Sequence, residues 1–299
     1  MASPTRTKSS KMAAVAAILL PLLPFGFLQW QNISSKFNIH NIEILIPSFS
    51  TTTSPNNTFT AMAERYAAAC PAHTISPHIF SSDPLIIYIA EYLMPAETSY
   101  LLHLATPYYR QSPVSKGYAL ETYDREIRSS MSAVVPDDPV VSCIEQRAVD
   151  FQGFAPRDHL EDVQVVKYGV SDHFRAHFDW FQGMANPRVS TFFVYLACDD
   201  GDDATEMGGG KCEGGATQFP HYEGRFPAKW CGWVDCEDDS GVGGVAFAPK
   251  VGNAVFWENL YPNGTGHPGV WHAGMPVKKG RKVGLNIFTR RDKWIPEQQ

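Results

Sequence analysis

A histidine and an aspartate two residues apart, His177 and Asp179, lie in a segment whose composition is typical of a strand. Side chains two apart on a strand project from the same face, so both could bind one metal ion. Of the downstream histidines, only His272 has a strand-like setting, whereas His221 and His267 have the surroundings of loop residues. Two histidines and one carboxylate on one face of a metal ion are typical of non-haem iron(II) and leave positions open for other ligands. The spacing predicts an iron(II) site at His177, Asp179 and His272.

A His-x-Asp pair is common by chance, and three neighbouring residues strengthen the metal prediction. Lys282 follows His272 by ten residues, Tyr168 precedes His177 by nine, and Thr217 lies in a Gly-Gly-Ala-Thr-Gln-Phe run. A cation buried near a metal is tolerated when an anion pairs with it. Lys282 could therefore bind the far carboxylate of a dicarboxylic acid cosubstrate, with the Tyr168 and Thr217 hydroxyls as further donors.

These residues belong to a longer succession of motifs. Tyr168 and the His-x-Asp pair are followed by Arg-x-x-Thr-x-x-x-Tyr-Leu at 188–196 and Gly-Gly-x-Thr-x-Phe at 214–219. Next come Pro-x-x-Gly-x-Ala-x-Phe at 249–256 and His-x-Gly-x-Pro-Val-x-x-Gly-x-Lys at 272–282. In this order, from about residue 76 to the C-terminus, the chain resembles the prolyl 4-hydroxylase alpha-subunit-like branch of the iron(II)/2-oxoglutarate dioxygenases.

The resemblance implies a fold and a reaction. The fold would be α+β, with a double-stranded β-helix (a distorted jelly roll) and supporting N-terminal helices. Iron(II) would bind to His177, Asp179 and His272, and 2-oxoglutarate to Lys282, with Tyr168 and Thr217 assisting. The chain would hydroxylate an organic substrate, with peptidyl proline expected, using O2 and releasing succinate and CO2. Ascorbate is the expected reductant.

The sequence departs from the family pattern at three positions near these motifs. Ala216 stands where the family often has glutamate, and Val283 and Phe288 stand where tryptophans are common. These changes leave the metal and cosubstrate residues intact but count against a collagen-like peptide as the substrate. The retained carboxylate of Asp179 argues against a halogenase.

Other functions are weighed against this hypothesis. A hydroxylase of a small molecule or of a peptide natural product fits the same site residues. The chain could also be a non-catalytic jelly-roll binding protein, but such a protein would not need all three metal ligands together with Lys282. A net charge of -6 without clustered basic residues argues against a nucleic-acid partner. Five aromatic residues could form a substrate groove or belong to the core: Trp180, Phe181, Trp257, Tyr261 and Trp271.

The elements that must position these residues change in type along the chain. Helices are expected from Pro95 and from Pro139, the second because Asp138 is a good N-cap and proline suits the first helical position. Short segments rich in Val, Phe and Tyr predict strands at 163–170, 189–197, 253–257 and 281–289. Residues 199–215 and 222–244 are expected to be long loops. This order indicates a β-sandwich or barrel preceded by helices.

The N-terminal region has a different composition. Arg6, Lys8 and Lys11 precede an apolar run from Met12 to Trp30, which predicts a signal anchor with a cytosolic tip within residues 1–30. A cleaved signal peptide and a buried helix are the alternatives. Residues 31–75, rich in Ser, Thr, Asn and Pro, are expected to be a flexible lumenal stalk. The catalytic domain is then expected at 76–299, with its dioxygenase core at about 163–290.

Cysteines and glycosylation sequons suit a lumenal location in the endoplasmic reticulum. The six cysteines predict disulfides in an oxidising compartment, although the sequence leaves the pairing open and a zinc site at the last four is the alternative. Asn-x-Ser/Thr sequons occur at Asn32, Asn56 and Asn263. The oligomeric state and any partner subunit are not determined by the sequence.

Overall fold

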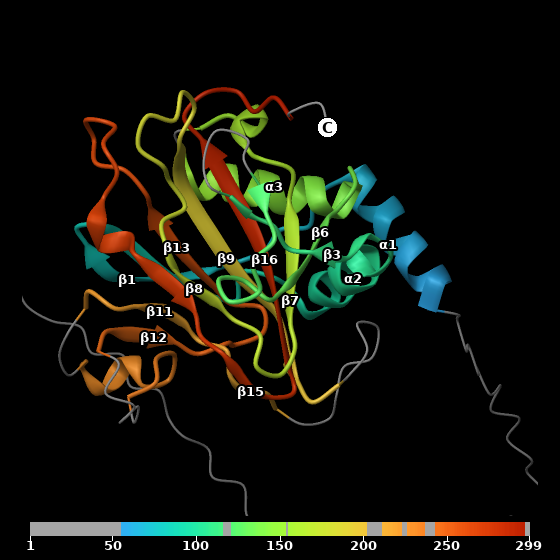
Figure 1. Ribbon diagram of the computed structural model, residues 1–299. Coiled ribbons are helices and arrows are strands. Elements are labelled where there is room, and N and C mark those ends of the chain that lie inside the picture. The colour runs from blue at the N-terminus through green and yellow to red at the C-terminus, as the bar shows by residue number, and fades with distance from the viewer. Residues whose placement is uncertain are drawn as a thin grey trace, which may run out of the picture. The chain divides into compact units, whose positions relative to one another are not determined.

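Two β-sheets form the centre of the folded part of the chain (Figure 1). The computed structural model describes residues 55–115, 121–153, 155–201, 211–222, 226–236 and 243–296. The larger sheet has eight strands in the order β1-β2-β13-β9-β16-β7-β6-β3, and the smaller has the order β12-β11-β14-β8. The strands of the larger sheet are Ser76–Ser82 (β1), Leu85–Ala90 (β2), Arg110–Gln111 (β3), Met131–Val134 (β6), Gln164–Tyr168 (β7), Arg188–Asp199 (β9), Ala254–Glu258 (β13) and Arg281–Arg290 (β16).

The smaller sheet lies against one face of the larger. Its strands are Phe174–His177 (β8), Thr217–Phe219 (β11), Val245–Phe247 (β12) and His272–Gly274 (β14). Two short pairs complete the strands: Val114–Ser115 (β4) with Glu121–Thr122 (β5), and Glu213–Gly214 (β10) with Val277–Lys279 (β15). From β7 onward the chain passes repeatedly between the sheets: β7, β9, β13 and β16 belong to the larger, and β8, β11, β12 and β14 to the smaller. Every neighbouring pair among these strands is antiparallel. This is the topology of a jelly roll, as predicted.

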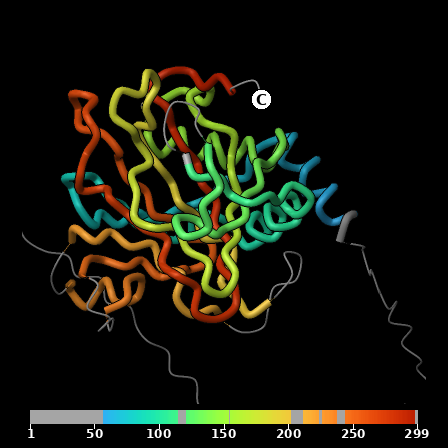
Figure 2. The backbone as a smooth tube through the Cα atoms, viewed as in Figure 1, coloured from blue at the N-terminus to red at the C-terminus, as the bar shows by residue number. Residues whose placement is uncertain are grey.

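Three helices accompany the larger sheet: Pro55–Ala68 (α1), Pro95–Ala105 (α2) and Pro139–Gln152 (α3). Figure 2 shows them in blue and green on one side of the fold, with the orange β11–β12 region on the other. The predicted start of α3 is confirmed, since the Asp138 carboxylate accepts a hydrogen bond of 2.8 Å from the Val140 N–H. At α2, the Glu97 carboxylate accepts from the Met94 N–H at 2.9 Å.

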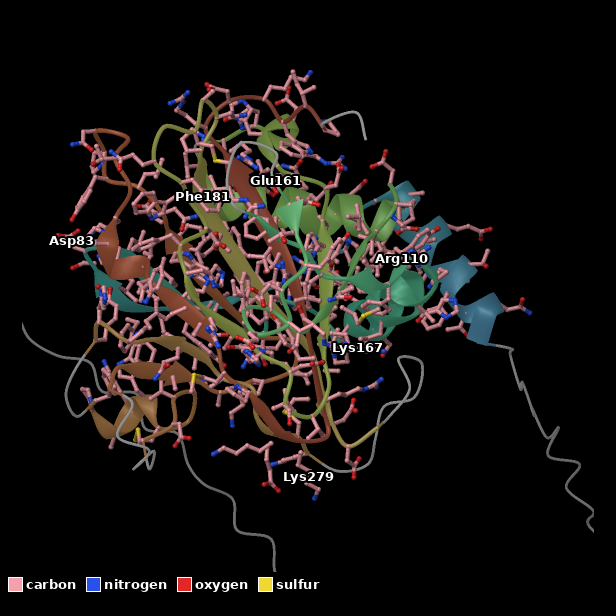
Figure 3. All side chains as sticks on the ribbon, viewed as in Figure 1. Asp83, Arg110, Glu161, Lys167, Phe181 and Lys279 are labelled. Carbon is pink, nitrogen blue, oxygen red and sulfur yellow. A yellow bond between two sulfur atoms is a disulfide. The ribbon has the colours of Figure 1, made fainter. Side chains whose placement is uncertain are left out.

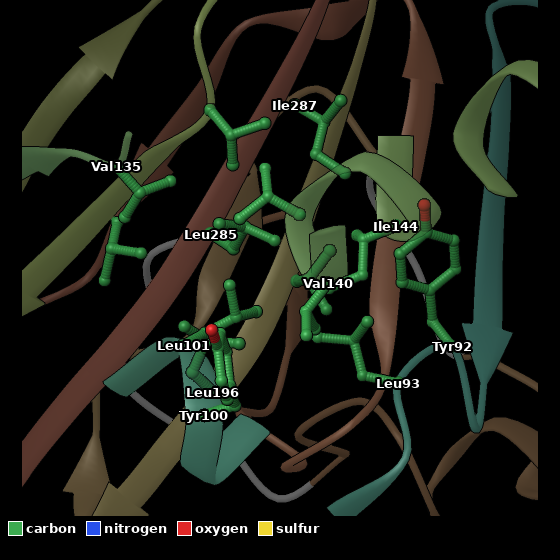
Figure 4. Packing of buried hydrophobic residues seen from close by; sticks show 14 of the residues in the cluster. Tyr92, Leu93, Tyr100, Leu101, Val135, Val140, Ile144, Leu196, Leu285 and Ile287 are labelled. Carbon is green, nitrogen blue, oxygen red and sulfur yellow. The ribbon is translucent and has the colours of Figure 1, made fainter. Parts of the chain in front are cut away.

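The larger sheet has two buried faces because alternate residues of its strands point in opposite directions. On the helix side, Leu196, Leu285 and Ile287 pack with residues of α2 and α3 (Figure 4). On the other side, Phe193, Tyr195 and their neighbours pack against the smaller sheet. The central strands are therefore apolar on both faces, as the continuous burial of β9 shows.

Two expectations on the N-terminal part need correction. Residues 55–68 were expected to belong to a flexible stalk but form α1, whose Met62 and Tyr66 are buried in the helix-side core. The Ser/Thr/Asn-rich composition hid this helix, because its order depends on contacts with distant residues such as Glu97, which accepts from the Tyr66 hydroxyl at 3.1 Å. The strands β1 and β2 were also not predicted. Residues 31–54 of the expected stalk and the whole expected signal anchor lie outside the described residues. Within the described part, no helix is long and apolar enough to cross a membrane.

All six cysteines are paired, so the alternative of a zinc site at the last four is wrong. The pairs are Cys70–Cys143, Cys198–Cys212 and Cys231–Cys236. The first joins the segment after α1 to α3. The other two lie within or beside the segments predicted as long loops, of which the structure describes 199–201, 211–215, 222, 226–236 and 243–244.

Candidate metal centre and cosubstrate pocket

The three predicted metal ligands come together between the sheets. His177 ends β8 and is the register partner of His272, the first residue of the neighbouring strand β14. Asp179 follows β8 by two residues and lies beyond the strand end, a detail that the strand-based prediction did not anticipate. Its Oδ1 lies 3.6 Å from His177 Nε2, and its Oδ2 lies 3.8 Å from His272 Nε2. One donor atom from each residue falls within 4.8 Å of the other two.

Hydrogen bonds outside the cluster orient both imidazoles. His177 Nδ1 donates to the Arg175 carbonyl oxygen at 2.8 Å, and His272 Nδ1 donates to the Val270 carbonyl oxygen at 2.9 Å. A carbonyl only accepts, so the proton of each neutral ring is on Nδ1 and the Nε2 lone pair faces the cluster. This arrangement of a backbone acceptor behind the ring is usual for metal-binding histidines.

The charge states also suit a cation. Burial lowers the pKa of His272 to about 4, and the adjacent His177 adds to this effect. Burial would raise the pKa of Asp179, but His272, His177 and Arg188 together hold it well below its usual range. The cluster thus offers a neutral imidazole and an ionised carboxylate at neutral pH. Nitrogen and oxygen donors of this kind fit iron(II) in a two-histidine, one-carboxylate site.

A cavity of about 390 Å³ opens onto the cluster and also contains the three residues predicted to bind a cosubstrate. Lys282 and Tyr168 are opposite each other on β16 and β7, and the Lys282 ammonium lies 4.4 Å from the centre of the Tyr168 ring. Burial lowers the pKa of Lys282 to about 7. Among the described residues, no carboxylate forms an ion pair with this ammonium. A dicarboxylic acid in the cavity would supply the missing anion.

The Thr217 hydroxyl lies in the wall of the cavity. The Tyr195 hydroxyl lies 2.9 Å from Thr217 Oγ1 and 3.1 Å from the Phe247 carbonyl oxygen, and its single proton can go to only one of them. When that proton goes to Thr217, the Thr217 proton is available to a ligand in the cavity. The preceding Gly214 and Gly215 have positive φ, and a side chain on Gly214 would lie 2.4 Å from the Pro276 carbonyl oxygen. The glycines let this segment approach β15 and the stem of Lys282.

Two arginines also line the cavity. Arg188, to which the sequence assigned no role, makes a paired contact with Glu161 at 2.6 and 2.7 Å and stacks 3.6 Å above the Phe288 ring. Arg128 was not singled out at all. Its guanidinium lies 4.6 Å from the Phe174 ring, which in turn stacks on His177 with centroids 3.7 Å apart. No motif marked Arg128, because its segment joins the site through tertiary contacts, among them the bridge between Arg128 and Phe174 at the start of β8.

Most of the aromatic residues proposed for a groove do line the cavity: Trp180, Phe181, Trp257 and Trp271. Tyr261 does not, since its ring packs against His267 at 4.1 Å. His267 is tied to Asp83 at 3.0 Å, away from the cluster, so it is a loop histidine as expected. Figure 3 shows Asp83 at the outer edge of the fold, by β1.

The sequence departures differ in their relation to the site. Phe288 is a wall of the cavity, whereas Val283 is buried on the helix side of the sheet. Ala216 does not line the cavity, and its carbonyl accepts from the Met275 N–H. Only the change at position 288 therefore alters the wall of the cavity.

A jelly roll with two histidines and one aspartate at its open centre defines the class of non-haem iron oxygenases. Comparison with known families is consistent with this: residues 163–290 match the 2OG-Fe(II) oxygenase superfamily. Residues 163–290 therefore form a 2-oxoglutarate- and iron(II)-dependent dioxygenase core, of the prolyl 4-hydroxylase type by distant homology.

Several relatives carry prolyl 4-hydroxylase names. "Probable prolyl 4-hydroxylase 10" of Arabidopsis thaliana is 28% identical over 219 residues, which are 71% of this chain and 71% of that protein. "Prolyl 4-hydroxylase subunit alpha-1" of Mus musculus is 30% identical over 227 residues, covering 72% of this chain but 35% of that protein. Among solved structures, the viral collagen prolyl hydroxylase of Paramecium Bursaria Chlorella virus-1 in its 2OG complex is 19% identical, with a TM-score of 0.45 over 69% of this chain and 95% of that chain.

Proposed function

We propose that this dioxygenase hydroxylates proline residues in a peptide, converting 2-oxoglutarate and O2 into succinate and CO2. The observation that carries the proposal is the buried Lys282 ammonium, which has no carboxylate partner among the described residues and shares its cavity with a metal-binding triad. That combination calls for a ligand with a carboxylate at one end and a metal-binding group at the other. 2-Oxoglutarate has both.

In this proposal, three residues bind the metal and three others bind the cosubstrate. His177, Asp179 and His272 hold iron(II), which supplies the chemistry that lets dioxygen react with an organic molecule. Lys282 binds the far carboxylate of 2-oxoglutarate, and Tyr168 and Thr217 donate their hydroxyl protons to it. The closed wall behind Lys282, which is 1% exposed, excludes water from this end. Fixing the cosubstrate here leaves the aromatic side of the cavity to the substrate.

The peptidyl proline substrate is supported by two observations. Phe178, Trp180, Phe181 and Trp271 line the cavity, and proline-rich segments are commonly bound in grooves lined with aromatic residues. The relatives named as prolyl 4-hydroxylases point to the same substrate. Phe288 lies in the cavity wall and departs from the tryptophan common in the family, so the accepted peptide sequence is expected to differ from a collagen-like one.

A substrate assay tests the proposal. The full-length chain is incubated with iron(II), 2-oxoglutarate and ascorbate, and succinate release is measured with a proline-rich peptide and with a matched peptide in which alanine replaces proline. We expect proline-dependent succinate release and a peptide mass increased by one oxygen atom. Turnover with small molecules and none with the peptide would overturn the prolyl assignment and favour the small-molecule alternative.

We further propose that the catalytic domain lies in the lumen of the endoplasmic reticulum, held by an N-terminal signal anchor. Three disulfides in the described residues support an oxidising compartment. Asn263 is exposed and available to a glycan. Fractionation with alkaline extraction tests the anchor: the chain should stay with membranes, and release of full-length protein into the soluble fraction would contradict this. Sensitivity of its electrophoretic mobility to a glycosidase would test lumenal exposure.

A further inference from the structure

A chain of three hydrogen bonds leads from the larger sheet to the Asp179 carboxylate. Trp257 Nε1 donates to Asn259 Oδ1 at 3.0 Å, and Asn259 Nδ2 donates to Thr191 Oγ1 at 2.9 Å. Thr191 Oγ1 then donates to Asp179 Oδ2 at 2.9 Å. Trp257, Asn259 and Thr191 are each at most 1% exposed. Water therefore cannot replace these contacts.

The direction of every proton in this chain is fixed by the chemistry of its first member. An indole N–H can only donate, so the Asn259 amide must turn its oxygen toward Trp257 and its NH2 group toward Thr191. Thr191 Oγ1 accepts from that NH2 group and has one proton of its own. The carboxylate of Asp179 is the acceptor for this proton, and an ionised carboxylate makes the bond stronger than one between neutral groups.

Backbone pairing holds the members of this hydrogen-bond series in place. Trp257 and Thr191 are directly opposite each other in the β13–β9 pair. Asn259 is anchored on both sides, because its N–H donates to the Val189 carbonyl at 2.8 Å and its carbonyl accepts from the His267 N–H at 2.9 Å. Three members therefore sit on a frame whose geometry the larger sheet determines.

Asp179 needs such a support more than the two histidines do. His177 and His272 lie on paired strands of the smaller sheet, whereas Asp179 lies past the end of β8. Thr191 thus ties this carboxylate to the larger sheet by a hydrogen bond, and Arg188, also on β9, lies 4.0 Å from Asp179 Oδ1. Trp257 also packs against the His272 ring with centroids 4.7 Å apart, so one indole contacts one metal ligand directly and another through hydrogen bonds.

We propose that Thr191 and Asn259 are positioning residues for the metal-binding carboxylate of Asp179. Trp257 is the donor that sets the direction of the hydrogen bonds between them. This inference rests on the proposed use of the triad as a metal site. Its consequence is that metal affinity depends on residues of the opposite sheet that do not touch the metal.

The test is a metal titration of four variants in the full-length chain, using cobalt(II) as a visible probe. Thr191→Val removes the donor but keeps the shape, and Thr191→Ser restores the hydroxyl. Thr289→Val is the matched control, since Thr289 is equally buried and its hydroxyl donates at 3.1 Å to Gln152, outside the site. Trp257→Phe removes the first donor while keeping a ring beside His272. Metal-free melting temperature is measured for each.

We expect Thr191→Val to weaken cobalt(II) binding about 10- to 100-fold, the usual effect of losing a residue that supports a metal ligand. Thr191→Ser should bind within about threefold of wild type, Thr289→Val should bind as wild type, and Trp257→Phe should be weakened in the same direction as Thr191→Val. The two threonine-to-valine variants should have similar metal-free melting temperatures.

Three outcomes overturn the inference, and a fourth concerns the proposed function instead. Wild-type affinity in Thr191→Val shows that the hydrogen bond does not position the ligand. Equal losses in Thr191→Val and Thr289→Val show a general packing effect. If Thr191→Val does not fold, wild-type affinity in Trp257→Phe overturns the inference. Failure of the wild type itself to bind cobalt(II), with His177→Ala indistinguishable from it, would instead refute the metal site.

Discussion

Replacing Lys282 with methionine is expected to stabilise the ligand-free protein while preventing 2-oxoglutarate binding. Lys282 is buried, and its ammonium contacts the Tyr168 and Phe193 rings at 4.4 and 5.2 Å. Among the described residues, no carboxylate pairs with it. Methionine keeps an unbranched apolar stem of similar length and removes only the charge that has to be desolvated.

The size of the effect follows from the pKa of the lysine. Burial lowers this pKa from 10.5 to about 7. At 1.36 kcal/mol per pH unit the difference corresponds to about 5 kcal/mol of destabilisation. The two ring contacts, at roughly 1 kcal/mol each, are lost in the variant. We therefore expect the variant to gain about 2–4 kcal/mol at pH 7, and its melting temperature to rise by roughly 5–15 °C.

The pH dependence has a definite sign. Between pH 7 and 10.5 the unfolded state retains the lysine proton that the folded state has released, so wild-type stability rises with pH in this range. The destabilisation is fully present below pH 7 and disappears toward pH 10.5. The advantage of Lys282→Met should therefore be largest at pH 7 or below and shrink by about 1.4 kcal/mol per pH unit above it.

Urea unfolding without metal or 2-oxoglutarate, at pH 6.5 and pH 9.5, measures both the gain and its pH dependence. Lys279→Met is the control, since Lys279 is an exposed lysine on β15 (Figure 3) and should change little at either pH. Saturating metal and 2-oxoglutarate should raise the melting temperature of the wild type but not of Lys282→Met. A variant that is less stable than wild type at pH 6.5, or whose advantage persists at pH 9.5, would refute the reasoning.

Three further predictions concern other parts of the structure. His177→Ala should abolish iron-dependent succinate release with an unchanged circular dichroism spectrum, and wild-type turnover would contradict its place in the metal site. Replacing both Cys198 and Cys212 with serine should cost about 3 kcal/mol in urea unfolding, because the disulfide closes a 14-residue loop; an unchanged midpoint would show that the loop is held by other contacts. Arg147→Met should cost about 3–5 kcal/mol because it leaves the buried Glu97 carboxylate unpaired. A double variant that also carries Glu97→Leu should recover most of this loss, and no recovery would point to packing instead.

Local sequence patterns were sufficient where one segment carries the whole signal. Asp138 followed by proline specifies the start of α3, since an N-cap and a first-turn proline act within three residues. The four predicted strands β7, β9, β13 and β16 form the centre of the larger sheet, and their β-branched and aromatic residues suit positions buried on both faces. Motif spacing likewise selected His177, Asp179 and His272, which the structure brings together.

Features that depend on pairing between distant segments could not be read from the sequence. The order of α1 depends on a buried face that meets α3 and α2, and its composition alone suggested a stalk. Six cysteines allowed fifteen pairings until the fold placed each sulfur beside its partner.

The site also combines residues that the sequence predicts with contacts that only the tertiary structure determines. Its metal ligands, Lys282, Tyr168 and Thr217 belong to motifs that a single sequence displays. The contacts of Arg128 with Phe174, and the hydrogen-bond chain from Trp257 to Asp179, arise only when segments up to 68 residues apart take up their register. A sequence states which donors exist, but the direction in which each one donates is decided by the neighbours that the tertiary structure places within 3 Å of it.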